Sequence, residues 1–303
     1  MTLEKRIKSM FIMLVPYIQS LRLLHWLKNV LIVAPALITH SLQIKDIHLF
    51  IFYIFIFCLT ASSVYCFNDL VDLEKDKKNP EKTKRPYASG SISKFHLLFL
   101  GLSLSCVSLV LAYFFMPIES FLLIICYLLL NLLYSFLVKN LFLVDCFLLA
   151  VFYLIRILIG ENLINVIYDK EVTFFFLAFS VSIFCGFAFI KRLNNLQRNI
   201  ENNINQGNIY SEPHIMTLKS FSLFFGISSI IIFFIYSMVP AQENYLHPEF
   251  LLIALIFLSI FYWRLYFFAS KGSMNYDPIV FSFSNIEPIV LMIITSFIFY
   301  YSY

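Results

Sequence analysis

The sequence predicts an all-α fold: a polytopic membrane helical bundle of about nine transmembrane helices with cytoplasmic cap segments. About 60% of the 303 residues are apolar, whereas soluble domains contain roughly 45–50%. The chain has 22 basic and 18 acidic residues, too few for the polar surface of a soluble globule of this length. The apolar residues are also grouped in runs close to the ~20 residues that a spanning helix requires.

The elements are expected in the following order. Residues 1–25 carry Lys5, Arg6 and Lys8 before a short apolar run that ends at Arg22, the pattern of an amphipathic helix on a membrane surface. The whole chain, 1–303, is expected to form a single domain. One helix is expected from each of the apolar runs at roughly 27–40, 47–67, 96–116, 118–138, 142–160, 172–190, 217–239, 249–269 and 280–302.

The connectors alternate in charge. Two long connectors, 68–95 and 191–216, are rich in lysine and arginine, whereas 40–46, 161–171 and 240–248 carry one lysine or none. The protein is expected in the cell (inner) membrane. The positive-inside rule places the N-terminus and both long connectors on the cytoplasmic side, and an odd helix count then places the C-terminus on the outer side. Long polar connectors on one face of a bundle predict cap segments over a cytoplasmic active site.

Two classes of function are excluded by composition. The net charge of +4 is too small for the basic footprint of a nucleic-acid-binding protein, so no nucleic-acid partner is expected. The six cysteines show neither Cys-x-x-Cys nor Cys/His ligand spacing, so neither a zinc site nor a disulfide framework is expected.

An acidic motif, Asn68, Asp69, Asp72 and Asp76, ends the second apolar run. At ~100° per residue these side chains lie at ~0°, ~100°, ~40° and ~80° around a helix, within about a quadrant. Like charges on one helix face repel each other, so the pattern favours a cation between them. Oxygen ligands suit Mg²⁺, and all four residues are predicted metal ligands. The alternative is a solvated helix end paired with neighbouring lysines.

A basic stretch follows the acidic motif directly. Lys82 and Arg85 are expected to neutralise a diphosphate beside the metal, and the arginine can bind phosphate through its guanidinium fork. Simple membrane anchoring by positive charge is the alternative. A metal site, basic residues and a membrane position together predict group transfer that involves a phosphorylated lipid.

The acidic motif, followed by Arg85-Pro86 and Ala88-Ser89-Gly90, resembles the first aspartate motif of the UbiA prenyltransferase superfamily. The resemblance implies an intramembrane, Mg²⁺-dependent transferase in which the three aspartates of the motif are catalytic.

Further stretches resemble the polyprenyl-phosphate phosphoribosyltransferase branch of that superfamily. Asparagines stand at 194, 195, 202 and 203, where aromatic prenyltransferases have a second aspartate motif, and Ser284 and Asn285 depart from the branch pattern. The resemblance implies phosphoribosyl diphosphate as donor and a polyprenyl phosphate as acceptor. The stretches are Arg22-x-x-His25-Trp26-Leu27-Lys28-Asn29, Asn79-Pro80-x-Lys82, Val144-Asp145 through Arg156 and Gly160, and Phe189-Ile190-Lys191-Arg192.

Two charges lie within the fifth apolar run. Asp145 is expected to face the active cavity as a catalytic residue, with an interior ion pair as the alternative. Arg156 lies ~16 Å deeper and only ~20° away around the helix. Such a charge must face the bundle interior, so Arg156 either binds phosphate or forms an ion pair, for which Glu287 is the expected partner. Substrate contacts are expected from Lys28, Asn29, Asn68, Lys82, Arg85, Tyr134, Lys139, Arg156, Lys191 and Arg192.

Two other functions stay open. The same aspartates could hold a prenyl diphosphate for transfer to an aromatic or other small acceptor. A transporter is the alternative outside enzymes, although glycine is scarce and the charges gather at one mouth rather than at the midplane.

Overall fold

A computed structural model describes residues 14–79, 82–202, 209–239, 241, 245–275 and 277–302. Every regular element within these residues is helical. The longest elements are α3 (Ile47–Val71), α5 (Lys94–Phe115), α6 (Ile118–Phe136), α7 (Val144–Tyr168), α8 (Phe174–Glu201), α9 (Ile215–Met238) and α11 (Glu249–Ser270). The shorter elements are η1 (Leu23–Val33), α2 (Ala34–Ile38), η2 (Ile44–Asp46), α4 (Leu73–Lys77), η3 (Lys82–Lys84), η4 (Val138–Asn140), η5 (Glu212–His214), α12 (Pro278–Ser284) and α13 (Ile286–Ser302).

The predicted membrane bundle is confirmed. The described chain has 8 helices long and apolar enough to cross a membrane, or 9 if the bent pair of α12 and α13 is one span. Those two helices meet at an angle of 93°. The run at 280–302 is therefore not one straight helix, because Asn285 has an extended backbone (φ −124°, ψ 136°) that ends α12.

The N-terminal part differs from the prediction of a surface helix over 1–25. Residues 1–13 lie outside the described residues. A helix is present from residue 14, and its end is at Arg22, where a φ of 53° turns the chain into the left-handed region. From Leu23 to Val33 the backbone is a 3₁₀-helix, and Leu14–Ile38 as a whole qualifies as a candidate span. The boundary is thus at Arg22 rather than at residue 25.

The predicted cap segments are more helical than expected. The helix α8 continues to Glu201, so the start of the 191–216 connector belongs to a helix, while 203–208 lies outside the described residues. Leu193 and Leu196 explain the extension, because both are buried in a core cluster and give the helix an apolar face past the membrane run. The connector at 68–95 contains the end of α3, α4 and η3.

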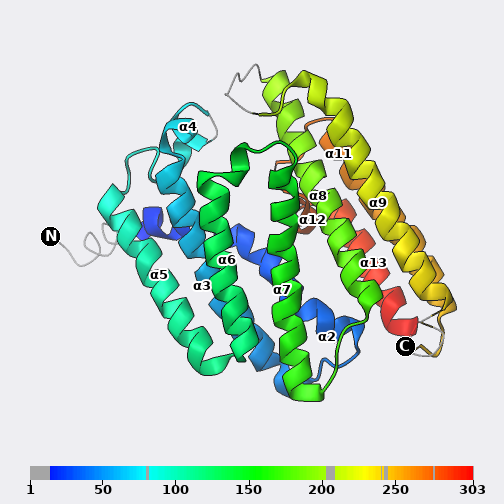
Figure 1. Cartoon of the computed structure of the whole chain (residues 1–303). Helices are drawn as coiled ribbons and strands as arrows, with labels where there is room; N and C mark the ends of the chain where they lie inside the picture. The colour runs from blue at the N-terminus through cyan, green and yellow to red at the C-terminus, as the bar shows by residue number, and fades with distance from the viewer. Residues whose placement is uncertain are drawn as a thin grey trace, which may run out of the picture.

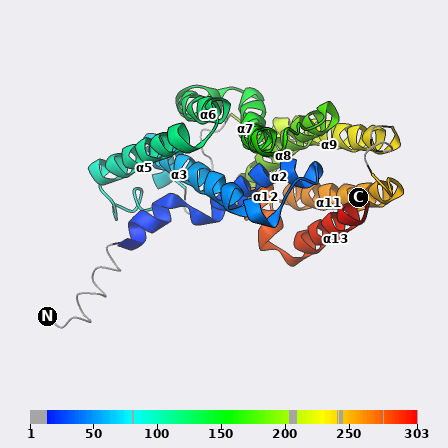
Figure 2. The same ribbon diagram turned by 90° about the horizontal axis from the view of Figure 1, so that it is seen from below.

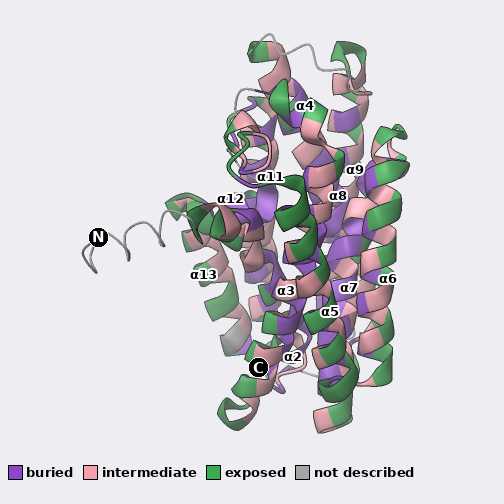
Figure 3. Ribbon diagram, turned by 90° about the vertical axis from the view of Figure 1, so that its left-hand side faces the viewer, coloured by how far each residue is buried: buried purple, intermediate pink, exposed green. Residues whose placement is uncertain are grey.

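The helix α7 lies at the centre of the bundle (Figure 1). It contributes Phe152 and Ile159 to a core shared with α3 and α6, and Tyr153 and Ile157 to a core shared with α8 and α11. Seen from below, α5 and α9 lie towards opposite ends of the bundle (Figure 2). The most apolar stretch of α7 is 56% buried, against 22% for α5, and exposed residues follow the outward faces in Figure 3. These apolar outward faces suit contact with lipid.

A close backbone contact joins α7 to η1. A Cβ atom at Gly160 would lie 2.0 Å from the carbonyl oxygen of Ile32. Glycine at this position therefore allows η1 to lie directly against α7. This contact brings Asn29 of η1 beside Arg156 of α7, and so connects the N-terminal segment to the interior of the bundle.

Candidate active site

Two carboxylates of the acidic motif converge on one cation. Asp69 at the end of α3 and Asp76 in α4 are 3% and 2% exposed. One guanidinium nitrogen of Arg85 lies 3.2 Å from the Asp69 carboxylate and 2.6 Å from that of Asp76. Arg22 forms a second ion pair with Asp69, and the Lys82 ammonium lies 4.0 Å from Asp76. The predicted site residues Asp69, Asp76, Lys82 and Arg85 are therefore assembled at the end of the bundle where α4 lies (Figure 1). Arg22 joins them, although it was not predicted as a site residue.

The other two residues of the acidic motif face different partners. Asp72 pairs with Lys139 of η4, and the Asn68 side-chain oxygen accepts a hydrogen bond from Ser135 of α6. The predicted common helix face is incomplete because α3 ends at Val71 and Asp72 has a non-helical backbone (φ −92°, ψ 7°). The motif thus connects α3 to α6 on one side and to the Arg85 loop on the other.

Lys82 lies among both cations and acids. Partial burial and the neighbouring Arg85 lower the pKa of Lys82, while Asp76 and Asp72 oppose this effect. An additional anion beside Lys82 and Arg85 would be attracted by both cations. This is the electrostatic property expected of a phosphate-binding position.

A second charged cluster surrounds Asp277, the residue before α12. Lys28 forms an ion pair with Asp277, and the two residues are 8% and 7% exposed. The other oxygen of Asp277 accepts a hydrogen bond of 3.2 Å from the Val280 amide and caps α12. Burial raises the pKa of Asp277, but Lys28 and Lys191 outweigh this effect and lower it to about 2. Asp277 is therefore ionised throughout the physiological range.

Lys191 of α8 has no such ion pair. Among the described residues, no carboxylate lies within 4.0 Å of its ammonium group. The charged groups with which it interacts electrostatically are mainly Lys28, Asp277, Arg192 and Lys82. Cations thus outnumber acids here, and the Asp277 cluster lies within electrostatic range of the Lys82 side of the acidic motif.

Asp145 lies in a self-contained polar network. Its side chain is fully buried, Arg192 lies 2.5 Å from one carboxylate oxygen, and the Tyr210 hydroxyl donates to the other. Arg192 also donates a hydrogen bond of 2.6 Å to the Tyr134 hydroxyl. The network links α6, α7 and α8 and places Tyr210, which carries no sequence signal for this role, against Asp145.

Arg156 faces the bundle interior as predicted and is 2% exposed. It donates to the Asn29 side-chain oxygen at 2.8 Å and to the Phe152 carbonyl, and its guanidinium lies 4.7 Å from the centre of the Phe57 ring. The expected partner was wrong. Glu287 pairs instead with Arg264 of α11 at 2.6 Å on an exposed face, because the bend between α12 and α13 carries it away from α7.

The donor chemistry of the acidic motif fits a divalent cation. Among the described residues, no group of three or more histidine, cysteine, aspartate or glutamate side chains is positioned to hold a metal. Asp69 and Asp76 nevertheless converge on a common cationic group, the Arg85 guanidinium. Their hard oxygen atoms are the ligands that Mg²⁺ takes from proteins, together with water and substrate phosphates.

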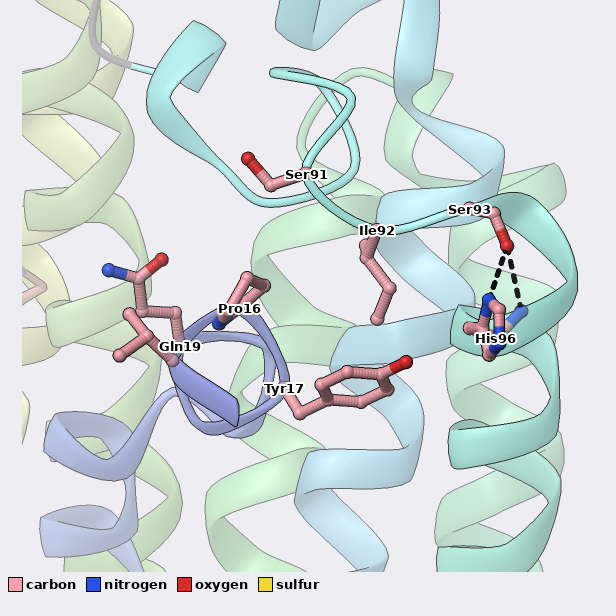
Figure 4. Close-up of a pocket in the computed structure, with 8 residues that line it drawn as sticks. Pro16, Tyr17, Gln19, Ser91, Ile92, Ser93 and His96 are labelled. Carbon is pink, nitrogen blue, oxygen red and sulfur yellow. Dashed lines mark hydrogen bonds between the residues drawn. The ribbon is translucent and has the colours of Figure 1, made fainter. Parts of the chain in front are cut away.

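The large surface hollow in Figure 4 is distinct from this site. It has a volume of about 740 Å³ and lies between the N-terminal helix and the start of α5. Tyr17, Ile92 and Ser93 line it, and the Ser93 hydroxyl is 2.7 Å from the His96 ring nitrogen. None of the predicted site residues lines this hollow.

Comparison with known proteins gives the relatives of the chain. It is 34% identical over 181 residues to the nodulation protein NoeC of Azorhizobium caulinodans, a match that covers 59% of this chain and 57% of that protein. It is 30% identical over 148 residues to the decaprenyl-phosphate phosphoribosyltransferase of Mycolicibacterium smegmatis, covering 47% of this chain and 46% of the relative. The chain thus spans about half the length of the curated relatives it matches.

The fold itself has solved counterparts. A UbiA homolog from Archaeoglobus fulgidus, bound to DMAPP and Mg²⁺, superimposes with a TM-score of 0.66 over 94% of this chain and 97% of that chain, at 13% identity. This likeness shows a shared fold. A family model described as "UbiA prenyltransferase family" matches residues 29–286, a range that contains the acidic motif, Asp145 and Asp277. Because this match covers most of the sequence, the chain belongs to the UbiA prenyltransferase family.

Proposed function

We propose that this protein transfers a 5-phosphoribosyl group from phosphoribosyl diphosphate to a polyprenyl phosphate. The observation that carries the proposal is the excess of cations around Asp277. Lys28 forms an ion pair with this carboxylate, whereas Lys191 has no ion pair in the described part of the chain. Lys191 is partly exposed. Because a charge partly withdrawn from water without a partner is costly, the pair of lysines favours an additional anionic ligand.

The number of phosphates distinguishes the two candidate reactions. Phosphoribosyl diphosphate and polyprenyl phosphate together carry a diphosphate, a 5-phosphate and a lipid phosphate. A prenyl diphosphate carries one diphosphate followed by hydrocarbon. Two cationic clusters, one at Arg85 and one at Lys28, therefore suit the phosphoribosyl reaction better.

Different residues bind the metal, the diphosphate and the 5-phosphate of the donor in this proposal. Asp69 and Asp76 would hold Mg²⁺, which supplies neutralisation of the charge that builds on the leaving diphosphate. Arg85 and Lys82 bind diphosphate oxygens, and Lys28 and Lys191 bind the phosphate at the other end of the donor. Separating the two anionic ends of the donor in this way orients its anomeric carbon.

The transfer itself requires no general base. An oxygen of the lipid phosphate attacks the anomeric carbon, a carbon–oxygen bond to the acceptor forms, and the bond to the diphosphate breaks with its electron pair leaving on the diphosphate. The attacking phosphate oxygen is already anionic, so no proton has to be removed. The similarity to decaprenyl-phosphate phosphoribosyltransferases supports this branch of the family.

The proposal is tested with purified protein and Mg²⁺. Radiolabelled phosphoribosyl diphosphate with polyprenyl phosphate is compared with geranyl diphosphate and 4-hydroxybenzoate. Labelled phosphoribosyl lipid is expected from the first pair. Product from the second pair alone would establish prenyl transfer and overturn the proposal.

A matched pair of lysine variants tests the observation that carries the proposal. Lys191→Gln is expected to raise the KM for phosphoribosyl diphosphate about tenfold or more, because a charge-assisted hydrogen bond is worth ~1.5–3 kcal/mol. Lys94→Gln is the control, because Lys94 is exposed at the start of α5. Equal KM values for both variants would contradict the assignment of Lys191.

A further inference from the structure

A small cavity lies between α3, α5 and α6, three helices that stand side by side in Figures 1 and 2. Its volume is about 210 Å³. The lining is mainly apolar, and one end reaches the acidic motif. The cavity is lined by Val64, Phe67 and Asn68 of α3, Ser105 and Leu109 of α5, and Leu128, Asn131 and Leu132 of α6.

The position of the cavity favours hydrocarbon as its content. All three helices are candidate membrane spans, so the apolar lining lies in the part of the molecule that lipid surrounds. Leu132 is 41% exposed, which shows that the lining reaches the outer surface of the bundle. The volume is below the ~300–1,000 Å³ typical of a pocket that encloses a whole drug-sized ligand. The cavity therefore suits one segment of a long chain that continues into the bilayer.

One end of the cavity adjoins polar and charged residues. Asn68 lines it and accepts a hydrogen bond from Ser135, one turn of α6 beyond the lining. Just past the end of α6, Lys139 of η4 pairs with Asp72 of the acidic motif. From Leu128 to Ser135 the helix rises ~10 Å. An amphiphile with its tail beside Leu128 would thus place its head near Lys139 and the acidic motif.

We propose that this cavity holds the head-proximal isoprene units of the polyprenyl phosphate, with the phosphate beside Lys139. The inference rests on the proposed function for the identity of the lipid. The ammonium group of Lys139 is complementary to a phosphate. The apolar side chains of the wall accept isoprene units, and the polar lining residues Ser105 and Asn131 donate hydrogen bonds within their own helices. The tail would leave between α5 and α6, because exposed apolar residues line that side of α6.

Photocrosslinking tests the cavity without requiring turnover. Protein in nanodiscs is incubated with a polyprenyl phosphate that carries a diazirine in its second isoprene unit, irradiated, and mapped by peptide mass spectrometry. Crosslinks are expected on residues 105–109 and 128–132, and unlabelled polyprenyl phosphate is expected to suppress them. Crosslinks confined to α8, α11 or α12, or suppression by phosphatidylglycerol to the same extent, would overturn the inference.

Filling the cavity gives a second readout. Leu109→Trp is expected to weaken binding of the lipid phosphate roughly tenfold or more, a loss of at least ~1.4 kcal/mol, while binding of phosphoribosyl diphosphate stays unchanged. Leu102→Trp is the control, because Leu102 lies on the same helix and is 54% exposed. Ser105→Leu fills the same cavity with a smaller group and keeps the test available if the tryptophan variant does not fold.

The outcomes separate the two proposals. Crosslinks in the cavity without phosphoribosyl transfer would support the lipid site and reject the proposed function. Transfer that proceeds normally in Leu109→Trp and Ser105→Leu, with crosslinks elsewhere, would reject the lipid site and leave the proposed function intact.

Discussion

The Lys28–Asp277 ion pair is expected to couple two distant parts of the chain energetically. Burial raises the pKa of Asp277, but Lys28 and Lys191 bring it from 3.8 to about 2. At ~1.36 kcal/mol per pKa unit, this lowering corresponds to about 2 kcal/mol in favour of the ionised carboxylate. Removing one partner costs more, ~3–5 kcal/mol, because the other charge is then left buried without a counter-ion.

The experiment is a double-mutant cycle of Lys28→Met and Asp277→Asn. Asparagine keeps a side-chain oxygen for the cap of α12, so the change removes mainly the charge. Each single variant is expected to lower the unfolding temperature by ~6 °C or more, at ~2 °C per kcal/mol. The double variant should recover at least about 2 kcal/mol relative to the sum. Thermal unfolding in detergent, followed by tryptophan fluorescence, measures these values.

The pH dependence provides an internal check on the sign. The folded-state pKa of Asp277 is depressed, so the stability from its charge is fully present above the unfolded pKa, near 4, and is lost as the pH falls towards 2. The difference in unfolding temperature between the parent and Asp277→Asn should therefore shrink as the pH falls from 5 towards 2. Additive single effects within ~0.5 kcal/mol, or a difference that does not shrink in acid, would refute the reasoning.

Three further predictions concern the rest of the bundle. Asp69→Asn, or removal of Mg²⁺ with EDTA, is expected to lower the rate of transfer at least ~100-fold. Glu74→Gln is the control and is expected to leave turnover unchanged, because the Glu74 carboxylate is exposed. Equal activity of both variants would argue against the metal site. Gly160→Ala is expected to destabilise the fold by ~1–3 kcal/mol through overpacking, measured as a lower unfolding temperature, because its Cβ would overlap the Ile32 carbonyl. Arg264→Gln is expected to shift the unfolding temperature by less than ~2 °C, because its pair with Glu287 is partly exposed and such pairs contribute ~0–1 kcal/mol.

Local pattern was sufficient for the membrane bundle and for part of the site. The apolar runs mark helices because a bilayer leaves no solvent to satisfy backbone groups other than the helix itself. Asp69 and Asp76, predicted to lie close together, both contact Arg85, although α3 ends between them. The burial of Arg156 followed from the cost of a charge at that depth.

The partners of the charges were decided by tertiary structure. The sequence could not show that Asp72 pairs with Lys139. It also could not show that Asp145 contacts Arg192 and Tyr210, or that Glu287 pairs with Arg264 rather than with Arg156.

These pairings depend on where helices end and cross. The end of α3 at Val71 and the bend at Asn285 are set by backbone conformations of single residues that a hydropathy pattern does not encode. Composition and spacing by themselves thus determined that the chain is a helical membrane protein with an acidic motif. Packing alone decided which cation meets which acid, because an ion pair depends on three-dimensional distance and burial rather than on separation along the chain.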